Sequence, residues 1–142
     1  MIETNYALNT IFFLISGAMV MWMAAGFTAL EAGSVRTKNV TEILTKNVAL
    51  FSVASIAFLF LGYEIMYGWT EPDTHSMYAD FFFQMVFVAT AMSVVSGAVA
   101  ERKKLWSFLI FTAIFSAVIY PLEGSWTWGG GFLSELGFFD FA

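Results

Sequence analysis

The chain has 142 residues, of which 59% are hydrophobic and only 12% are charged, and its mean hydropathy is +0.75. So short a chain could not bury this apolar surface within itself in water, and its composition is the opposite of that of a disordered protein, so it is predicted to lie in lipid. The formal net charge of −5 disfavours a nucleic-acid partner, and the lack of cysteine excludes disulfide bonds and thiolate metal sites.

Four stretches are apolar over the roughly 20 residues that a helix needs to cross a bilayer. They are expected at about residues 6–32, 45–67, 79–100 and 105–122, and residues 123–142 are expected to begin the loop that follows. The first stretch has no basic segment ahead of it, so we interpret it as a retained span rather than a cleaved signal peptide. Pro121 lacks a backbone N–H donor and is expected to mark the end of the fourth span. The predicted fold class is an all-α membrane protein that forms one domain over residues 1–142.

Small side chains allow helices to approach one another closely in lipid. The first span is expected to present Gly17, Ala25, Ala29 and Gly33 on one face, and the third span to present Ala89, Ser93 and Gly97. These two faces predict that the spans pack into a bundle.

The positive charges of the chain are confined to two connections, and lysine and arginine mark the cytoplasmic ends of membrane spans. These residues are Arg36, Lys38 and Lys46 in the first connection and Arg102, Lys103 and Lys104 in the third. The N-terminus, the connection before the third span and the residues after the fourth are therefore predicted to lie outside the cell. Most of the carboxylates fall on that outer side, where they could attract cations through screened charge.

Nothing in the sequence resembles a catalytic or metal-binding constellation. The chain has one histidine, His75, which lies in a polar turn and is interpreted as a solvated side chain. The sequence contains no zinc-protease, serine-hydrolase or nucleotide-binding motif. An enzyme is therefore not expected, nor is a bound metal or cofactor.

Aromatic residues near the predicted outer face are the strongest candidates for function. Phe83 and Phe87 are four residues apart, so their rings stack on one side of a helix and could close a narrow pore by keeping it dry. Packing against lipid or core is the alternative for this pair. Trp128 precedes a glycine triplet and belongs either to an interfacial aromatic belt or to a cation–π site for a small cation. Asp140 lies among phenylalanines and could stabilise a cation or cap a following helix.

Several of these pieces occur together in one order. They are Ala25-Gly26-Phe27, Ala32-Gly33-Ser34-Val35-Arg36-Thr37-Lys38-Asn39-Val40, Gly97-Ala98-Val99-Ala100-Glu101-Arg102, Trp128-Gly129-Gly130-Gly131 and Asp140-Phe141-Ala142. In this order and at this spacing they closely resemble the ammonium transporter (Amt/Mep/Rh) family over essentially the whole chain. The resemblance implies the N-terminal four spans of an inverted-repeat transporter of about eleven helices, assembled as a homotrimer with one pore in each subunit.

The resemblance also assigns roles to individual residues. It implies that ammonium is recruited at an outer vestibule by the indole of Trp128, passes a gate formed by Phe83 and Phe87, and is conducted as ammonia plus a proton. Gln84 is expected to help line the vestibule, and Asp140 is expected to support the geometry and cation preference of the recruitment site. The protein is accordingly expected in the cytoplasmic membrane of a prokaryote, with ammonium, ammonia and the lipid bilayer as its partners.

On the cytoplasmic face the resemblance implies a further partner, a trimeric PII-type regulator that docks there and blocks the pore. The residues expected to contact it are Arg36, Lys38, Arg102, Lys103 and Lys104, which topology signals alone would also explain. The alternative to a transporter is an ammonium receptor, in which the same domain binds ammonium and passes the signal to a cytoplasmic module.

The chain departs from the resembled family in its length. Four spans are present where about eleven are implied, and the two histidines of the lower pore are missing, since His75 lies in an outer turn. We therefore expect a fragment or a truncated form of a longer transporter. A role in assembly without transport is a third interpretation.

Overall fold

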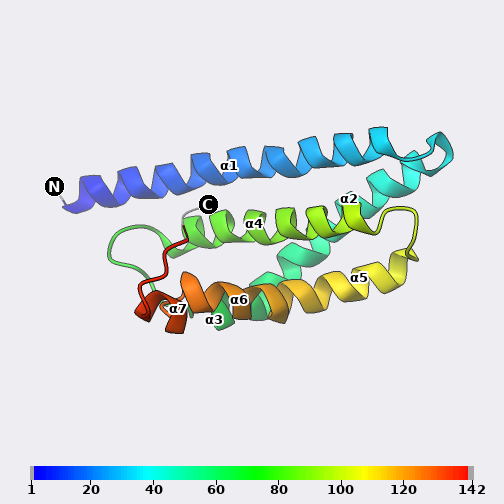
Figure 1. Ribbon diagram of the computed structural model, residues 1–142. Helices are drawn as coiled ribbons and strands as arrows, with labels where there is room; N and C mark the ends of the chain where they lie inside the picture. Colours follow the sequence, from blue (N-terminus) through cyan, green and yellow to red (C-terminus); the bar gives the residue numbers. More distant parts are fainter. Residues whose placement is uncertain (1, 141–142) are drawn as a thin grey trace.

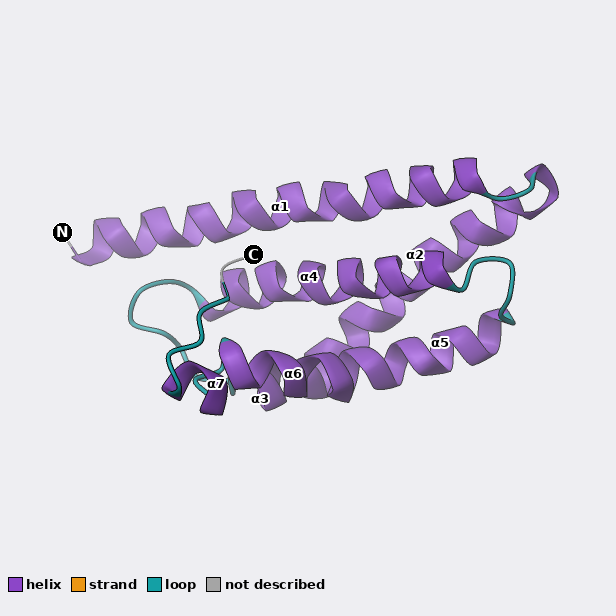
Figure 2. Ribbon diagram, in the orientation of Figure 1, coloured by secondary structure: helices purple, strands orange, loops and turns teal. Residues whose placement is uncertain are grey.

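The computed structural model describes residues 2–140, and every regular element in that range is helical (Figure 2). Four helical segments are long and apolar enough to cross a membrane, namely Glu3–Ser34, Thr37–Met66, Met77–Ala98 and Leu105–Glu135. The predicted all-α class with four membrane spans is therefore confirmed. Met1, Phe141 and Ala142 lie outside the described residues, and with them the end of the sequence segment 140–142 that contributes to the family resemblance.

The four segments are built from the following elements. The first is α1 (Ile2–Ser34). The second consists of the short turn η1 (Thr37–Asn39), α2 (Val40–Ala57), the π-helical η2 (Phe58–Gly62) and α3 (Tyr63–Met66). The third is α4 (Met77–Ala98). The fourth consists of α5 (Leu105–Ile114), the π-helical η3 (Phe115–Ile119), α6 (Tyr120–Thr127) and the short α7 (Phe132–Glu135).

Helix α4 is the central element of the bundle. It lies between α1 on one side and the α5–α6 segment on the other, with α2 crossing behind it (Figure 1). One buried cluster joins α2, α4 and α5 through Leu50, Met92 and Phe108. A second joins η2, α3 and α4 through Phe58, Tyr63, Met66 and Val88. The outward face of α1 leaves large apolar side chains such as Trp22 exposed, as suits a surface covered by lipid or by further protein.

Two glycines allow α1 and α4 to pack closely. A Cβ atom on Gly17 would lie 2.7 Å from the ring of Phe82, and one on Gly97 would lie 2.7 Å from the ring of Phe27. Each glycine therefore accommodates a phenyl ring from the opposite helix, which is close packing of the kind expected between helices in lipid.

The small-residue face predicted for the first span is wrong beyond Gly17. Ala25, Ala29 and Gly33 are exposed in α1 and are not buried against another helix. Residues four apart drift by about 40° around an α-helix, so a run of them leaves the packed face within a few turns.

The fourth segment does not end at Pro121, as the sequence predicts, but continues beyond it as α6. Pro121 is the second residue of α6 and follows η3, where the N–H of Tyr120 bonds to the carbonyl of Phe115. Because the π turn shifts the hydrogen-bond register at this point, the missing N–H of proline does not interrupt the helix. Gly62 of η2 packs here, since a Cβ on it would lie 2.7 Å from the carbonyl oxygen of Ser116.

The two connections that carry cations lie at the same end of the bundle, formed by residues 35–39 and 99–104, which we call the basic end (Figure 1). The start of α1, residues 67–76 and residues 128–140 lie at the opposite end, which we call the acidic end. Lys46 belongs to neither connection, because it lies within α2 and is buried.

Candidate functional site

Phe83 and Phe87 lie one turn apart on α4 and contact each other edge to face, with ring centroids 5.0 Å apart and ring planes at 77°. Phe13 of α1 extends this contact, since its ring centroid lies 5.2 Å from that of Phe83, and His75 packs on Phe13 at 4.5 Å. The four rings form a row along the α1–α4 interface that runs inward from the acidic end. The structure thus brings the predicted pair together and adds His75, for which the sequence predicts no role.

Asp80 lies on the same helix, one turn closer to the acidic end, and only 8% of it is exposed. Its Oδ2 accepts a hydrogen bond of 2.7 Å from the hydroxyl of Tyr63, and its Oδ1 accepts one of 3.2 Å from the amide of Gln84. Gln84, which the resemblance places at a vestibule, is therefore bonded to a neighbouring carboxylate. The sequence analysis missed Asp80, although its spacing from Phe83, Gln84 and Phe87 by three, four and seven residues places it on their helix face.

Trp128 directly follows α6, and its indole N–H donates a hydrogen bond of 3.0 Å to the backbone carbonyl of Asp140. The indole is 45% exposed, so its ring is accessible from the acidic end. A Cβ on Gly129 would lie 2.3 Å from the carbonyl oxygen of Met66, so this glycine lets the turn pack on α3 rather than freeing a face of the indole. The structure brings Trp128 and Asp140 together at the end of α6, whereas the phenylalanine pair lies on α4.

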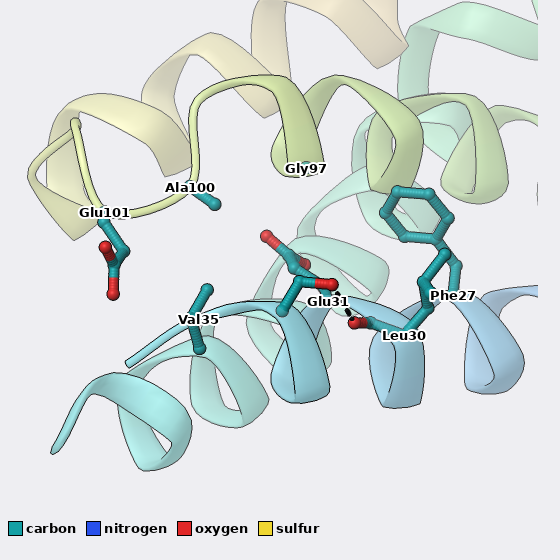
Figure 3. A pocket seen from close by; sticks show the side chains of 8 residues that line it. Phe27, Leu30, Glu31, Val35, Gly97, Ala100 and Glu101 are labelled. Atoms are coloured by element: carbon teal, nitrogen blue, oxygen red, sulfur yellow. Dashed lines mark hydrogen bonds between the residues drawn. The ribbon is translucent and has the colours of Figure 1, made fainter. Parts of the chain in front are cut away.

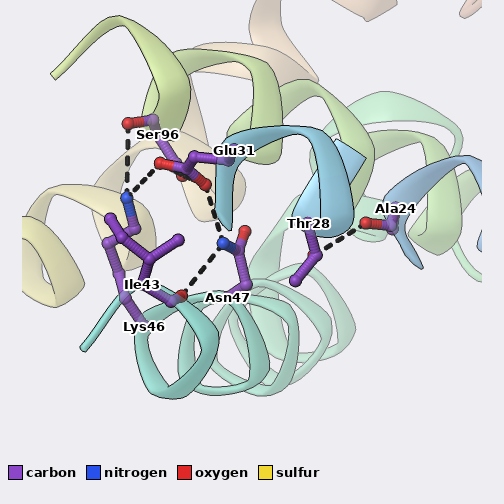
Figure 4. A network of polar contacts seen from close by, with 7 residues as sticks. All are labelled: Ala24, Thr28, Glu31, Ile43, Lys46, Asn47 and Ser96. Atoms are coloured by element: carbon purple, nitrogen blue, oxygen red, sulfur yellow. Dashed lines mark hydrogen bonds and ion pairs between the residues drawn. The ribbon is translucent and has the colours of Figure 1, made fainter. Parts of the chain in front are cut away.

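A buried polar network joins α1, α2 and α4 towards the basic end (Figure 4). The carboxylate of Glu31 accepts hydrogen bonds from Lys46 Nζ at 2.5 Å, from Asn47 Nδ2 at 2.7 Å and from Ser96 Oγ at 3.0 Å. Sequence reasoning missed this network and read Lys46 as a topology signal. The available clue was that Glu31 and Lys46 border apolar spans, where a charge is costly unless it is paired.

A cavity of about 360 Å³ opens between α1 and α4 beside this network (Figure 3). It is lined by Phe27, Leu30, Glu31, Ser34, Val35, Gly97, Ala100 and Glu101. Both carboxylates that line it are already paired, Glu31 with Lys46 and Glu101 with Arg36. Over the described residues 2–140, no group of three or more histidine, cysteine or acidic side chains is placed to hold a metal ion.

Glu101 ties the two connections of the basic end to each other. Its carboxylate accepts hydrogen bonds from the backbone N–H of Arg36 at 3.0 Å, from Arg36 Nε at 3.2 Å and from Asn39 Nδ2 at 2.6 Å. Glu101 has a φ of 60°, a left-handed conformation that few non-glycine residues adopt without a specific role. Of the predicted partner-binding cations, Arg36 is engaged in this contact. The others, Lys38, Arg102, Lys103 and Lys104, are exposed at the same end.

The contacts from Arg36 and Asn39 lower the pKa of Glu101 from 4.5 to about 2, with the backbone N–H of Arg36 as the largest cause. A lowered pKa means that the contact is fully formed above pH 4.5 and is lost as the pH falls through about 2. We therefore expect the amide N–H of Arg36 to stay protected from hydrogen exchange at pH 4.5 and above. In Glu101→Gln, which removes the charge, this protection should fall at neutral pH, and equal protection in both proteins would contradict the assignment.

A sequence model described as the Ammonium Transporter Family matches residues 11–142 of the chain. The chain is 44% identical to a protein named ammonium transporter Amt2 from Archaeoglobus fulgidus, over 86% of the chain and 29% of that protein. It is 39% identical to a protein named ammonium transporter Amt2 from Haloferax mediterranei, over 94% of the chain and 34% of that protein. The chain spans about a third of the length of the curated relatives that it matches.

Proposed function

Because the chain belongs to the ammonium transporter family, we propose that it forms the outer recruitment site and gate of a protein that transports ammonium across a membrane. The family is one of transporters, and the proposed activity is transport rather than catalysis. We propose that the activity resides in a longer protein, of which this chain is a fragment or truncated form, because its relatives are about three times as long.

The observation that carries this proposal is the edge-to-face contact between Phe83 and Phe87 on α4. Two phenyl rings in succession on one wall of a narrow path offer no hydrogen bonds to water, so a path that runs past them tends to stay dry. An ammonium ion would have to shed its hydration to pass, and we propose that it passes as ammonia and a proton. Hydrated ions lack that route and would be held back.

The recruitment step is proposed for Trp128, whose ring is accessible at the acidic end. A cation over the face of an indole is stabilised by about 1 to 2 kcal/mol. The hydrogen bond from the Trp128 indole to the backbone carbonyl of Asp140 fixes the plane of the ring, which supports the proposed role of Asp140 in the geometry of the site. We propose that Gln84 contributes to the vestibule through the hydrogen bond that its side-chain amide donates to the Asp80 carboxylate.

We further propose a homotrimer in a cytoplasmic membrane, with the acidic end and the N-terminus outside. The gathering of the cations at one end of the bundle supports this orientation. The exposed cations Lys38, Arg102, Lys103 and Lys104 also support a docking site for an acidic PII-type regulator at the basic end, with Arg36 held in place by Glu101.

Replacing Trp128 by leucine in the full-length protein tests the proposed recruitment site. In proteoliposomes we expect the KM for methylammonium uptake to rise about tenfold, because loss of the cation–π contact weakens recruitment. Trp126→Leu is the matched control, since Trp126 is also 45% exposed but its ring contacts Phe132 instead. Equal effects of the two changes would contradict the recruitment role, and specific binding of ammonium without uptake by the wild type would favour the receptor alternative.

A further inference from the structure

Asp80 occupies an unusual position relative to the proposed gate. Asp80, Phe83, Gln84 and Phe87 follow one another at the spacing that places residues on a single face of α4. A rise of about 1.5 Å per residue puts the backbone of Asp80 about 4.5 Å from that of Phe83, towards the acidic end. The carboxylate thus stands at the outer side of the phenylalanine pair.

The partners of this carboxylate are neutral. Tyr63 donates to Oδ2 and Gln84 donates to Oδ1, so both oxygens are held in place without an ion pair. All six lysine and arginine residues lie at positions 36–46 and 102–104, towards the other end of the bundle. Among the described residues 2–140, the ion pairs are those of Arg36 with Glu101 and Lys46 with Glu31.

Tyr63 holds the carboxylate rigidly, because its own ring is fixed by other rings. It is 2% exposed, and its ring centroid lies 4.6 Å from that of Trp69 and 5.5 Å from that of Phe81. The Tyr63–Asp80 bond therefore connects the end of the second segment to the start of α4 at a defined position. A fixed, poorly solvated carboxylate is screened less by salt than a surface charge, so its field extends to the adjacent gate.

We propose that Asp80 is a selectivity residue of the gate, whose carboxylate attracts a monovalent cation with N–H groups to the outer side of Phe83. The proposal rests on the transport function proposed above, and it adds a second attractive group beyond Trp128. A charge without a cationic partner inside an apolar bundle is costly, and it is typically retained where a passing ion supplies the partner. Asp80 acts on the substrate by charge, and Tyr63 and Gln84 position it.

The test is uptake of methylammonium by the full-length protein in proteoliposomes, with wild type, Asp80→Asn, Asp80→Glu and Tyr63→Phe compared. Asparagine has the shape of aspartate, and its side-chain oxygen can still accept the hydrogen bond from Tyr63. The side-chain amide of Gln84 can rotate so that its oxygen accepts from the NH2 group of the asparagine, so this change removes the charge alone. We expect Asp80→Asn to raise the KM about tenfold with little change in maximal rate. Asp80→Glu keeps the charge and should restore most of the wild-type KM that Asp80→Asn loses. Tyr63→Phe keeps the charge but removes the hydrogen bond that positions the carboxylate, so it should raise the KM by a smaller factor than Asp80→Asn.

A purely structural role for Asp80, as acceptor for Tyr63 in the first turn of α4, predicts the opposite pattern. Asp80→Asn would then leave the KM unchanged and Tyr63→Phe would lower the amount of assembled protein, and this result overturns the proposal. If Asp80→Asn fails to assemble, the double change Asp80→Leu with Tyr63→Phe replaces both polar partners by apolar groups and must still show the raised KM. Failure of that variant to assemble also overturns the proposal, whereas absence of uptake by the wild type would overturn the transport function itself.

Discussion

Replacing Lys46 by methionine is expected to lower the free energy of unfolding by about 3–5 kcal/mol, because the change leaves the Glu31 carboxylate buried without its cation. Glu31 is 4% exposed and Lys46 is 8% exposed, so water cannot replace the lost partner without opening the bundle. The ammonium group also lies 5.4 Å from the centre of the Phe108 ring, which adds a cation–π contact between α2 and α5. Unfolding in detergent, followed by circular dichroism against denaturant, measures the loss.

Two further variants separate the buried charge from a general effect of removing a lysine. Lys103→Met, at an exposed position of the basic end, should change stability by no more than about 0.5 kcal/mol. Adding Glu31→Gln to Lys46→Met should recover much of the loss, because a neutral amide can still accept from Asn47 and no unpaired charge remains. If Lys46→Met is as stable as Lys103→Met, the Glu31 carboxylate is hydrated and the network does not hold the three helices together.

The network illustrates what the sequence could not predict. Hydropathy separates apolar spans from charged connections. It therefore places Lys46 at the end of a span and predicts no partner for Glu31. Whether a charge at such a border faces water or is buried depends on its partner, and here the partner lies 15 residues away on another helix. Only the packing of α1 against α2 and α4 decides that these two charges meet.

The helix period, in contrast, is sufficient to predict which residues of a single helix lie side by side. The contact of Phe83 with Phe87 follows from their spacing, and the four spans follow from the length of the apolar stretches. The end predicted at Pro121 was wrong because the π-helical η3 precedes the proline and the helix continues as α6, and no residue pattern predicted this π turn. Only the family resemblance predicted that Asp140 lies near Trp128, and their hydrogen bond depends on a loop that folds back over 12 residues.

Replacing Phe87 by alanine is expected to reduce the preference for methylammonium over potassium on the order of a hundredfold in the full-length protein, a change of about 2.7 kcal/mol. Phe87 supplies one of the two rings that keep the proposed path dry, and the ring of Phe83 alone cannot cover the length of path that both rings line. Water that enters the space left by the Phe87 ring would let hydrated potassium pass. Ammonium gains less from this water, because it is proposed to pass as ammonia and a proton. Potassium efflux and methylammonium uptake, both measured in proteoliposomes, give the ratio.

A ring pair of the same spacing elsewhere in the chain provides the control for this change. Phe111 and Phe115 are also four residues apart, with centroids at 5.9 Å, but they belong to α5 and η3 of the fourth segment rather than to α4. Phe111→Ala removes an equal volume and should leave the ratio unchanged. If Phe87→Ala instead disrupts assembly while the protein that does assemble keeps its selectivity, the pair belongs to the packing of α4 against α1, and the gate must be formed by other residues.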